Sequence, residues 1–303
     1  MTQICSRLAA GFTPLLSLSL MACPGPADSG LPGDSQPSVS YTGPRPEACD
    51  RYSTLGSFGI ELMSAGAGFS GVLLDSPSPF TTQELVSAGE CRLYGWEHQP
   101  HCDPPCEGET ICAYDDTCRA WPANLSVGTL RLLGTEPELE LEPTEWGSYT
   151  YTEAWPTPYA PGAQLTLQAQ GAGQVDAFTL TLAGSPLLEQ ERIELTMRPG
   201  QPLIIPWDPP EGPEGMRMRV RLSIDHHAST PGYAACDAPA GQGSVTVSSA
   251  IVDGLIAAGA TGIGTYVESS SLTLASEAWA DTSSGCIVFE TASSQHFDVG
   301  TEL

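Results

Sequence analysis

Residues 216–225 read Met-Arg-Met-Arg-Val-Arg-Leu-Ser-Ile-Asp, and this stretch decides the fold class. Apolar and polar side chains alternate strictly, so the apolar ones share one face of a strand and the charged ones share the other. Such alternation is typical of an antiparallel sheet that buries one face. We therefore predict a half-buried strand here.

The same pattern extends outward on both sides of this stretch. Residues 127–132, 165–168 and 178–182 alternate in the same way. Further strands are expected at 58–63, 69–74, 193–197, 203–207, 244–247, 272–275 and 286–290. Only residues 82–87 and 248–255 indicate short helices. With 32 glycines and 27 prolines, the chain is predicted to be all-β, with one or two immunoglobulin-like antiparallel sandwiches in residues 122–303 and a break near 185–190.

Eight cysteines follow residue 48. They are Cys49, Cys91, Cys102, Cys106, Cys112, Cys118, Cys236 and Cys286. The N-terminus, described below, indicates that the chain is exported, and an even number of cysteines in an exported chain predicts disulfide bonds. We expect residues 49–121 to form a small cysteine-rich domain, in which Cys49 and Cys91 bracket the first predicted strands and helix and would pair with each other. Cys236 and Cys286 are expected to bridge strands of the sandwich, with two buried free thiols as the alternative.

The densest cysteine cluster lies between Cys102 and Cys118, next to His98 and His101. Four thiolates could bind zinc, but only Cys102 and Cys106 have the spacing that zinc sites usually show. An oxidising compartment favours disulfides instead. Four cysteines permit three pairings. We expect Cys102 to pair with Cys112 and Cys106 with Cys118, which resembles half of an EGF-like module, and we predict no metal site.

The N-terminus has the layout of a secretory signal peptide, residues 1–22, with Arg7 before an apolar run. It ends in Leu20-Met21-Ala22-Cys23, which resembles the lipobox of bacterial lipoproteins. That resemblance implies that Cys23 carries diacylglycerol and becomes the acylated N-terminus. Residues 23–48 are rich in Pro, Gly and Ser and are predicted to be a disordered tether. Pro24, after the lipidated cysteine, favours the outer membrane by the same resemblance.

Charge and hydropathy narrow the function classes. The formal net charge is -25, and all 11 basic residues are arginines. Lysine chemistry is therefore excluded, and nucleic acid is not an expected partner because binding it requires clustered cations. No second apolar run approaches the roughly 20 residues that a membrane helix needs. Attachment to a membrane would therefore depend on the lipid at Cys23.

Two polar motifs could carry chemistry. Asp225, His226 and His227 form a histidine pair with a carboxylate, which we interpret as a solvated turn. The second motif is a run of glutamates, Glu136, Glu138, Glu140, Glu142 and Glu145, which could chelate calcium or supply an acid-base pair. A solvated strand face is the simpler interpretation. No catalytic residue and no cofactor are predicted.

An aromatic stretch runs from Trp146 to Tyr159. Within it, Tyr149, Tyr151 and Trp155 are at odd positions, so they would share one face of a strand. Such a row could stack on sugar rings or on a partner protein, and it could equally be packed within the sandwich. We name these three residues as candidate ligand-binding residues.

The full layout is a lipobox, a tether, a cysteine-rich segment and Gly/Pro-rich strands. It resembles secreted lipoproteins of myxobacterial type, which implies a location and a fold class without an activity. We expect a lipoprotein anchored in the cell envelope with a non-catalytic binding or structural role and a protein or glycan ligand. The alternative is an exported hydrolase that acts on glycans through a carboxylate pair.

Overall fold

A computed structural model describes residues 49, 53–79, 82–98, 100–212, 214–226, 229–258, 270–282 and 285–302. This part of the chain is all-β, as predicted, with a single α-helix among the described residues. None of its helices is long and apolar enough to span a bilayer. The predicted signal peptide, Cys23 and tether, together with His227, lie outside the described residues.

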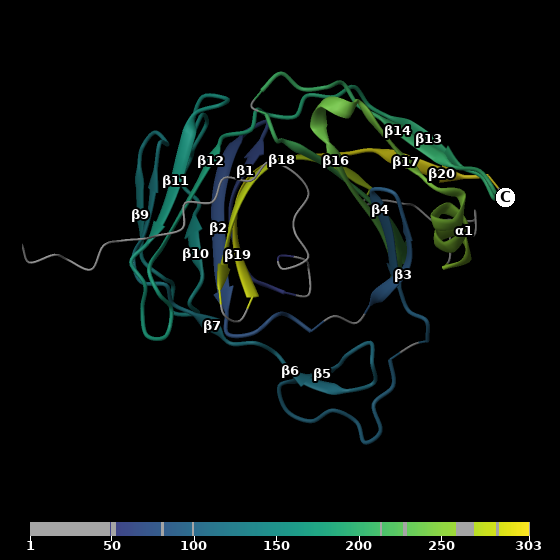
Figure 1. Cartoon of the computed structure of the whole chain (residues 1–303), viewed down its shortest axis with the longest axis horizontal. Helices are drawn as coiled ribbons and strands as arrows, with labels where there is room; N and C mark the ends of the chain where they lie inside the picture. Colours follow the sequence, from purple (N-terminus) through teal and green to yellow (C-terminus); the bar gives the residue numbers. More distant parts are fainter. Residues whose placement is uncertain are drawn as a thin grey trace, which may run out of the picture. The chain divides into compact units, whose positions relative to one another are not determined.

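The largest sheet has ten strands drawn from both ends of the chain (Figure 1). They are β1 (Thr54–Met63), β2 (Gly66–Leu74), β3 (Gln83–Ala88), β4 (Cys91–Gly95), β7 (Asn124–Leu125), β10 (Tyr149–Tyr151), β15 (Arg217–His226), β16 (Ser229–Pro239), β18 (Ser271–Thr282) and β19 (Gly285–His296). Their order is β10-β2-β1-β19-β18-β15-β16-β4-β3, with β7 paired to β2. Four strands from residues 49–121, β1 to β4, are therefore part of the main sheet. They do not form the separate small domain that we predicted.

The interior of this sheet contains a parallel pair, β1 with β19, in which Phe58 is opposite Phe289. The other ladders of the sheet are antiparallel. The wholly antiparallel immunoglobulin-like arrangement that we expected is thus replaced by a mixed sheet. The reason is topological, because β1 enters the sheet beside a strand that is more than 200 residues away in sequence.

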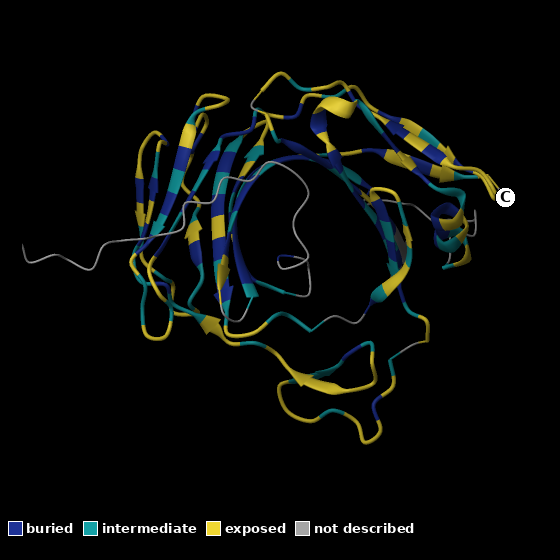
Figure 2. Cartoon of the chain, in the orientation of Figure 1, coloured by how far each residue is buried: buried dark blue, intermediate teal, exposed yellow. Residues whose placement is uncertain are grey.

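Two smaller layers cover one face of the main sheet. The first is a four-stranded sheet of β8 (Leu130–Leu133), β9 (Leu139–Leu141), β11 (Gln164–Ala169) and β12 (Phe178–Ala183). The second contains the pairs β13 (Glu194–Met197) with β20 (Asp298–Thr301) and β14 (Leu203–Pro206) with β17 (Ser244–Val247), together with α1 (Ser249–Ala257) and the short 3₁₀ helix Ala240–Gln242. The alternating buried and exposed residues along these strands are visible in Figure 2.

Strand β18 shows how one sheet face contributes to two cores. Leu272 and Leu274 pack in the core under the second layer. Ala278 and Ala280, on the same face, pack in the core under the four-stranded sheet. Each fully buried leucine contributes about 1.5–3 kcal/mol relative to an exposed one, so the face is held along its length.

A segment without strand structure, residues 184–193, crosses from one core to the other. Its backbone bonds to side chains of β19: Ser185 N donates to Thr291 Oγ1 (3.0 Å) and Leu188 N to Ser293 Oγ (3.0 Å). Gln295 closes the series, because its Oε1 accepts from Gln190 N and its Nε2 donates to Gln190 O. The predicted break near 185–190 falls in this segment, but strands from both sides of the segment join the same ten-stranded sheet.

The two predicted helices have different outcomes. Residues 249–257 form α1, which Ser248 caps by accepting from Ile251 N, and which buries Ile251, Val252 and Leu255. Residues 83–88, in contrast, form the edge strand β3 paired with β4. Pairing with β4 satisfies one side of this strand, and this tertiary contact overrides a weak local helical preference.

Candidate functional site

Four disulfides fasten the described chain. They join Cys49 to Cys286, Cys91 to Cys236, Cys102 to Cys112 and Cys106 to Cys118. The last two are the pairings that we predicted for the cysteine cluster. The first two differ from the prediction, which paired Cys49 with Cys91 and Cys236 with Cys286.

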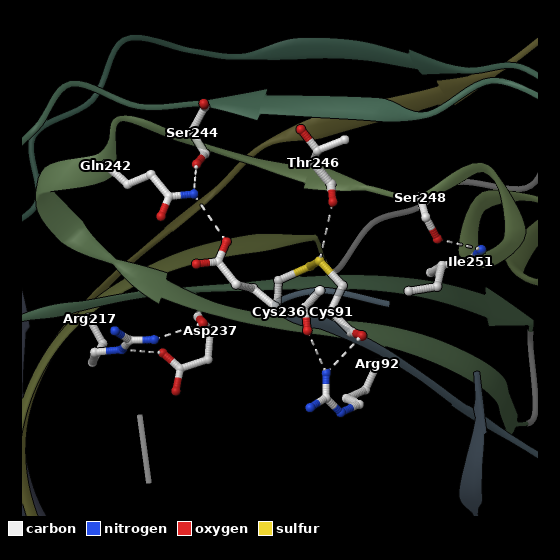
Figure 3. The surroundings of a disulfide bond; sticks show 12 residues. Cys91, Arg92, Arg217, Cys236, Asp237, Gln242, Ser244, Thr246, Ser248 and Ile251 are labelled. Carbon is white, nitrogen blue, oxygen red and sulfur yellow. Dashed lines mark hydrogen bonds and ion pairs between the residues drawn. A yellow bond between two sulfur atoms is a disulfide. The ribbon is translucent and has the colours of Figure 1, made fainter. Parts of the chain in front are cut away.

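Strand neighbourhood explains the correct pairing of the long-range bonds. Cys91 of β4 is directly opposite Cys236 of β16 in an antiparallel ladder. Figure 3 shows this bond beside the Thr246 carbonyl of β17, which lies 3.8 Å from the Cys91 sulfur. Cys286 begins β19 next to β1, so it meets Cys49, which precedes β1. Sequence spacing carries no information about these neighbours.

The cysteine cluster forms an exposed loop around the hairpin of β5 (Thr110–Cys112) and β6 (Cys118–Ala120). The sulfurs of Cys102, Cys106 and Cys118 lie close together, but each is in a disulfide, so they are not thiolate ligands for zinc. The flanking histidines instead meet one carboxylate. His98 Nε2 lies 2.8 Å from Asp116 Oδ2, and His101 N donates to Asp116 Oδ1.

Asp116 connects the hairpin of that loop to the preceding segment through its carboxylate. It has a φ of 57°, in the left-handed region that aspartate tolerates better than most residues. The hydrogen bonds from the His101 backbone and the His98 side chain hold the pKa of Asp116 below its usual range. The histidine cluster therefore has a structural role in joining the hairpin to the preceding segment.

The three predicted ligand-binding aromatics are mainly core residues. Tyr149 is fully buried; its hydroxyl accepts from Val127 N and donates to Gly128 O. Trp155 is 3% exposed and donates to Glu136 O. Tyr151 is half-buried and meets Trp155 edge-on. Cross-strand packing, the alternative interpretation, explains Tyr149 and Trp155, which are not accessible to a ligand.

Trp146 is the aromatic residue of this stretch that reaches the surface. Its exposed fraction is 74%, the largest among the exposed large hydrophobic residues of the described chain. It was part of the predicted aromatic stretch but not one of the three candidates. The local sequence Thr-Glu-Trp-Gly-Ser carried a signal, because Gly147 takes a φ of 74° that lets the chain turn and expose the indole.

The turn that carries Trp146 is held by a dense set of hydrogen bonds. Thr144 N donates to Ser148 O, Gly147 N donates to Thr144 O, and Thr144 Oγ1 accepts from the backbone N of Trp146 and of Ser148. Asn124 Nδ2, from β7, donates to Trp146 O at 2.6 Å. The backbone of the turn at Trp146 is thus held by Thr144 from within the turn and by Asn124 from β7.

A shallow hollow of about 550 Å³ opens beside the indole. Its lining is mixed: Pro122, Asn124, Ser126, Pro143, Thr144, Glu145, Trp146 and Gly147. Ser126 Oγ accepts from Gly128 N, which leaves its hydroxyl proton available. Glu145 is exposed at the rim. One aromatic side chain is therefore surrounded by a few hydrogen-bonding groups in a shallow hollow.

The second face of the main sheet carries paired charges. The Arg217 guanidinium donates to the side-chain carboxylate and to the backbone carbonyl of Asp237 (Figure 3). Arg219 forms ion pairs with Glu277 and Glu290, which are opposite each other on β18 and β19. These arginines belong to the alternating stretch 216–225, so the predicted charged face exists and its charges neutralise one another.

Next to these pairs, Arg221 lies 4.0 Å above the centroid of the Tyr233 ring, a cation–π contact. Tyr233 stacks in turn on Tyr94 of β4.

All five residues of the glutamate run are exposed. Arg131 pairs with Glu140 across the β8–β9 ladder, and Thr129 donates to Glu142. Glu140 alone lies in a strand, β9, and among the described residues the five glutamates do not gather around one point.

A second hollow, of about 600 Å³, lies along the crossing segment and is bordered by Met63, Leu187, Glu189 and Asp208. The other described lining residues include Ser293 and Gln295, which the segment itself uses for hydrogen bonds.

Comparison with known proteins finds no matching family model and no matching curated protein for this chain.

Proposed function

We propose that this protein is a lipid-anchored component of the cell envelope whose folded domain binds a ligand or supports the envelope without catalysing a reaction. The observation that carries the proposal is the state of the cysteines. All eight that follow residue 48 are in disulfides. Disulfides persist in oxidising compartments outside the cytoplasm, which supports the export that the N-terminal pattern predicts.

The anchor at Cys23 would give stable attachment because several acyl chains act together. Each buried methylene contributes about 0.8 kcal/mol, and one chain alone binds only marginally. The tether would keep the folded domain clear of the headgroups, from which its net charge of -25 would also repel it.

Metabolic labelling tests the anchor. Cells that express the full chain are fed an alkyne fatty acid, and the purified protein is assayed for label. We expect labelling of the wild type and of Cys5→Ala, since Cys5 lies within the signal peptide, and no labelling of Cys23→Ala. Equal labelling of Cys23→Ala would contradict the proposal.

A hydrolase acting on glycans is the second candidate function. The observation in its favour is that Glu277 and Glu290 are directly opposite each other in the β18–β19 ladder. Both carboxylates, however, pair with Arg219, and neither borders the two hollows described above. Glycan hydrolysis that is lost in Glu290→Gln but kept in Glu140→Gln, with both variants folded, would favour the hydrolase.

A further inference from the structure

We propose that the Trp146 hollow binds a neutral carbohydrate, with the indole stacked on a pyranose ring. This inference rests on the proposed binding role and specifies its ligand. A pyranose ring has a face of C–H groups and a rim of hydroxyls, so its site needs one flat apolar surface and several hydrogen-bonding groups at the edge. The hollow beside Trp146 supplies both.

The aromatic surface is supplied by Trp146, whose π face carries partial negative charge and attracts C–H groups. The backbone that carries this indole is held in a turn by Thr144 and Asn124. A fixed backbone reduces the ordering cost of binding. The turn is thus organised before a ligand arrives.

The polar edge is supplied by Asn124 and Ser126, which belong to one segment, and by Glu145 from the turn. Asn124 uses its Nδ2 on the turn, and its Oδ1 makes no hydrogen bond within the described residues, so it can accept one from a hydroxyl. Ser126 can donate, because its oxygen already accepts from Gly128 N. Glu145 can accept through its carboxylate. Donors and acceptors of this kind match the hydroxyl groups of a sugar.

The charge of the site selects among carbohydrates. Glu145 lies beside the indole, and no arginine borders the hollow. The chain as a whole carries a net charge of -25. An acidic glycan would therefore be repelled, and a neutral one is favoured.

A protein partner is the competing occupant, since tryptophan is frequent at interface hot spots. A stable interface buries about 800 Å² per partner around a core of apolar and aromatic groups. The hollow has one large apolar side chain, Trp146, among prolines and polar groups. Its composition fits a sugar better than it fits the centre of a protein interface.

The test uses the full chain in detergent on an array of neutral and acidic oligosaccharides, followed by titration calorimetry with the best neutral tetrasaccharide. Trp146→Ala is the variant, and Trp121→Ala is the matched control, because Trp121 is also an exposed tryptophan, 55% accessible, outside the lining. Circular dichroism checks that both variants keep the wild-type fold.

We expect binding of neutral glycans, at least a tenfold loss of affinity in Trp146→Ala, wild-type affinity in Trp121→Ala and partial retention in Trp146→Tyr. An array without neutral ligands overturns the proposal, as does unchanged binding by Trp146→Ala. Preference for acidic glycans or capture of a protein alone also overturns it. Each outcome is independent of lipid labelling at Cys23, so the two proposals can fail separately.

Discussion

Gly71 of β2 lies directly under the ring of Phe58 on the neighbouring strand. A Cβ at this position would come within 2.1 Å of Phe58 Cδ1. Phe58 is fully buried at the centre of the core under the four-stranded sheet and meets Tyr149 and Phe178. The absence of a side chain at residue 71 is therefore what lets the aromatic ring lie flat on the sheet.

The first prediction follows from this contact. Gly71→Ala should lower the free energy of unfolding by about 1–3 kcal/mol, because Phe58 must leave its position in a packed core. Gly68→Ala on the same strand is the control, since the nearest atom to its added Cβ is Tyr151 O at 3.9 Å. Urea denaturation of both variants measures the difference. Equal stabilities would contradict the role of Gly71.

A second prediction concerns Tyr159, whose ring covers Gly184. Burial raises the pKa of this phenol above its ordinary value of 10.0. Since the folded state favours the neutral form, the contribution to stability is complete below the unfolded pKa and is lost as pH rises through the folded pKa. Tyr159→Phe should therefore lose less stability than the wild type between about pH 9 and pH 12. Identical losses in urea titrations across that range would exclude this role.

At the scale of elements, the crossing segment shows how a stretch without strand structure can be firmly placed. Backbone groups of residues 185–190 bond to Thr291, Ser293 and Gln295, which alternate along one face of β19. Thr291 and Ser293 are buried. A backbone N–H that lost either hydroxyl as its acceptor could not bond to water instead. Side chains thus replace the missing ladder.

A third prediction tests that replacement. Ser293→Ala leaves the Leu188 N–H without its acceptor in a buried position, which should cost about 1–3 kcal/mol. Ser294→Ala is the control, because Ser294 is on the opposite face and bonds only to Thr273 at the exposed surface. Thermal unfolding compares the two. A larger destabilisation by Ser294→Ala would contradict the assignment.

Elements were predictable where their faces differ. The alternation at 216–225 and at 178–182 located β15 and β12 because one face of each carries buried apolar side chains and the other carries polar ones. Strand β3 was mistaken for a helix because its apolar residues are adjacent in sequence: Leu85 is exposed and Val86 is partly buried, so the period of two is weak. Residues 298–301, which form β20, gave no signal since they are short and contain one apolar side chain.

For the candidate site, the sequence identified the aromatic stretch but not its accessible member. Tyr149 and Trp155 are residue types that also occur in ligand-binding sites. Their hydrogen-bond partners, Val127, Gly128 and Glu136, show that they belong to the core. Those partners come from other segments. Accessibility depends on tertiary packing, which local sequence does not encode.

At the scale of the whole molecule, two disulfides connect strands near the N-terminus to strands near the C-terminus. The bonds Cys49–Cys286 and Cys91–Cys236 span 237 and 145 residues. The two bonds of the exposed loop span 10 and 12 residues. Long loops restrict the unfolded chain most, so the first pair should dominate global stability.

A fourth prediction compares these bonds. The double variant Cys91→Ala/Cys236→Ala should lose about 2–5 kcal/mol of unfolding free energy. Cys102→Ala/Cys112→Ala should change the global transition less, because its loop lies outside both cores. Guanidinium denaturation measures both, and non-reducing peptide mapping of the wild type should recover the Cys91–Cys236 pair. A larger loss in the loop variant would contradict this ranking.

The pairing of β1 with β19 also has a consequence for biosynthesis. Strand β1 is synthesised more than 200 residues before its neighbour β19. The main sheet therefore cannot form completely until residues 285–296 have been synthesised. Pairings this distant in sequence form slowly. If the chain is exported as proposed, the pairing of β1 with β19 would be completed only after residues 285–296 had crossed the translocon.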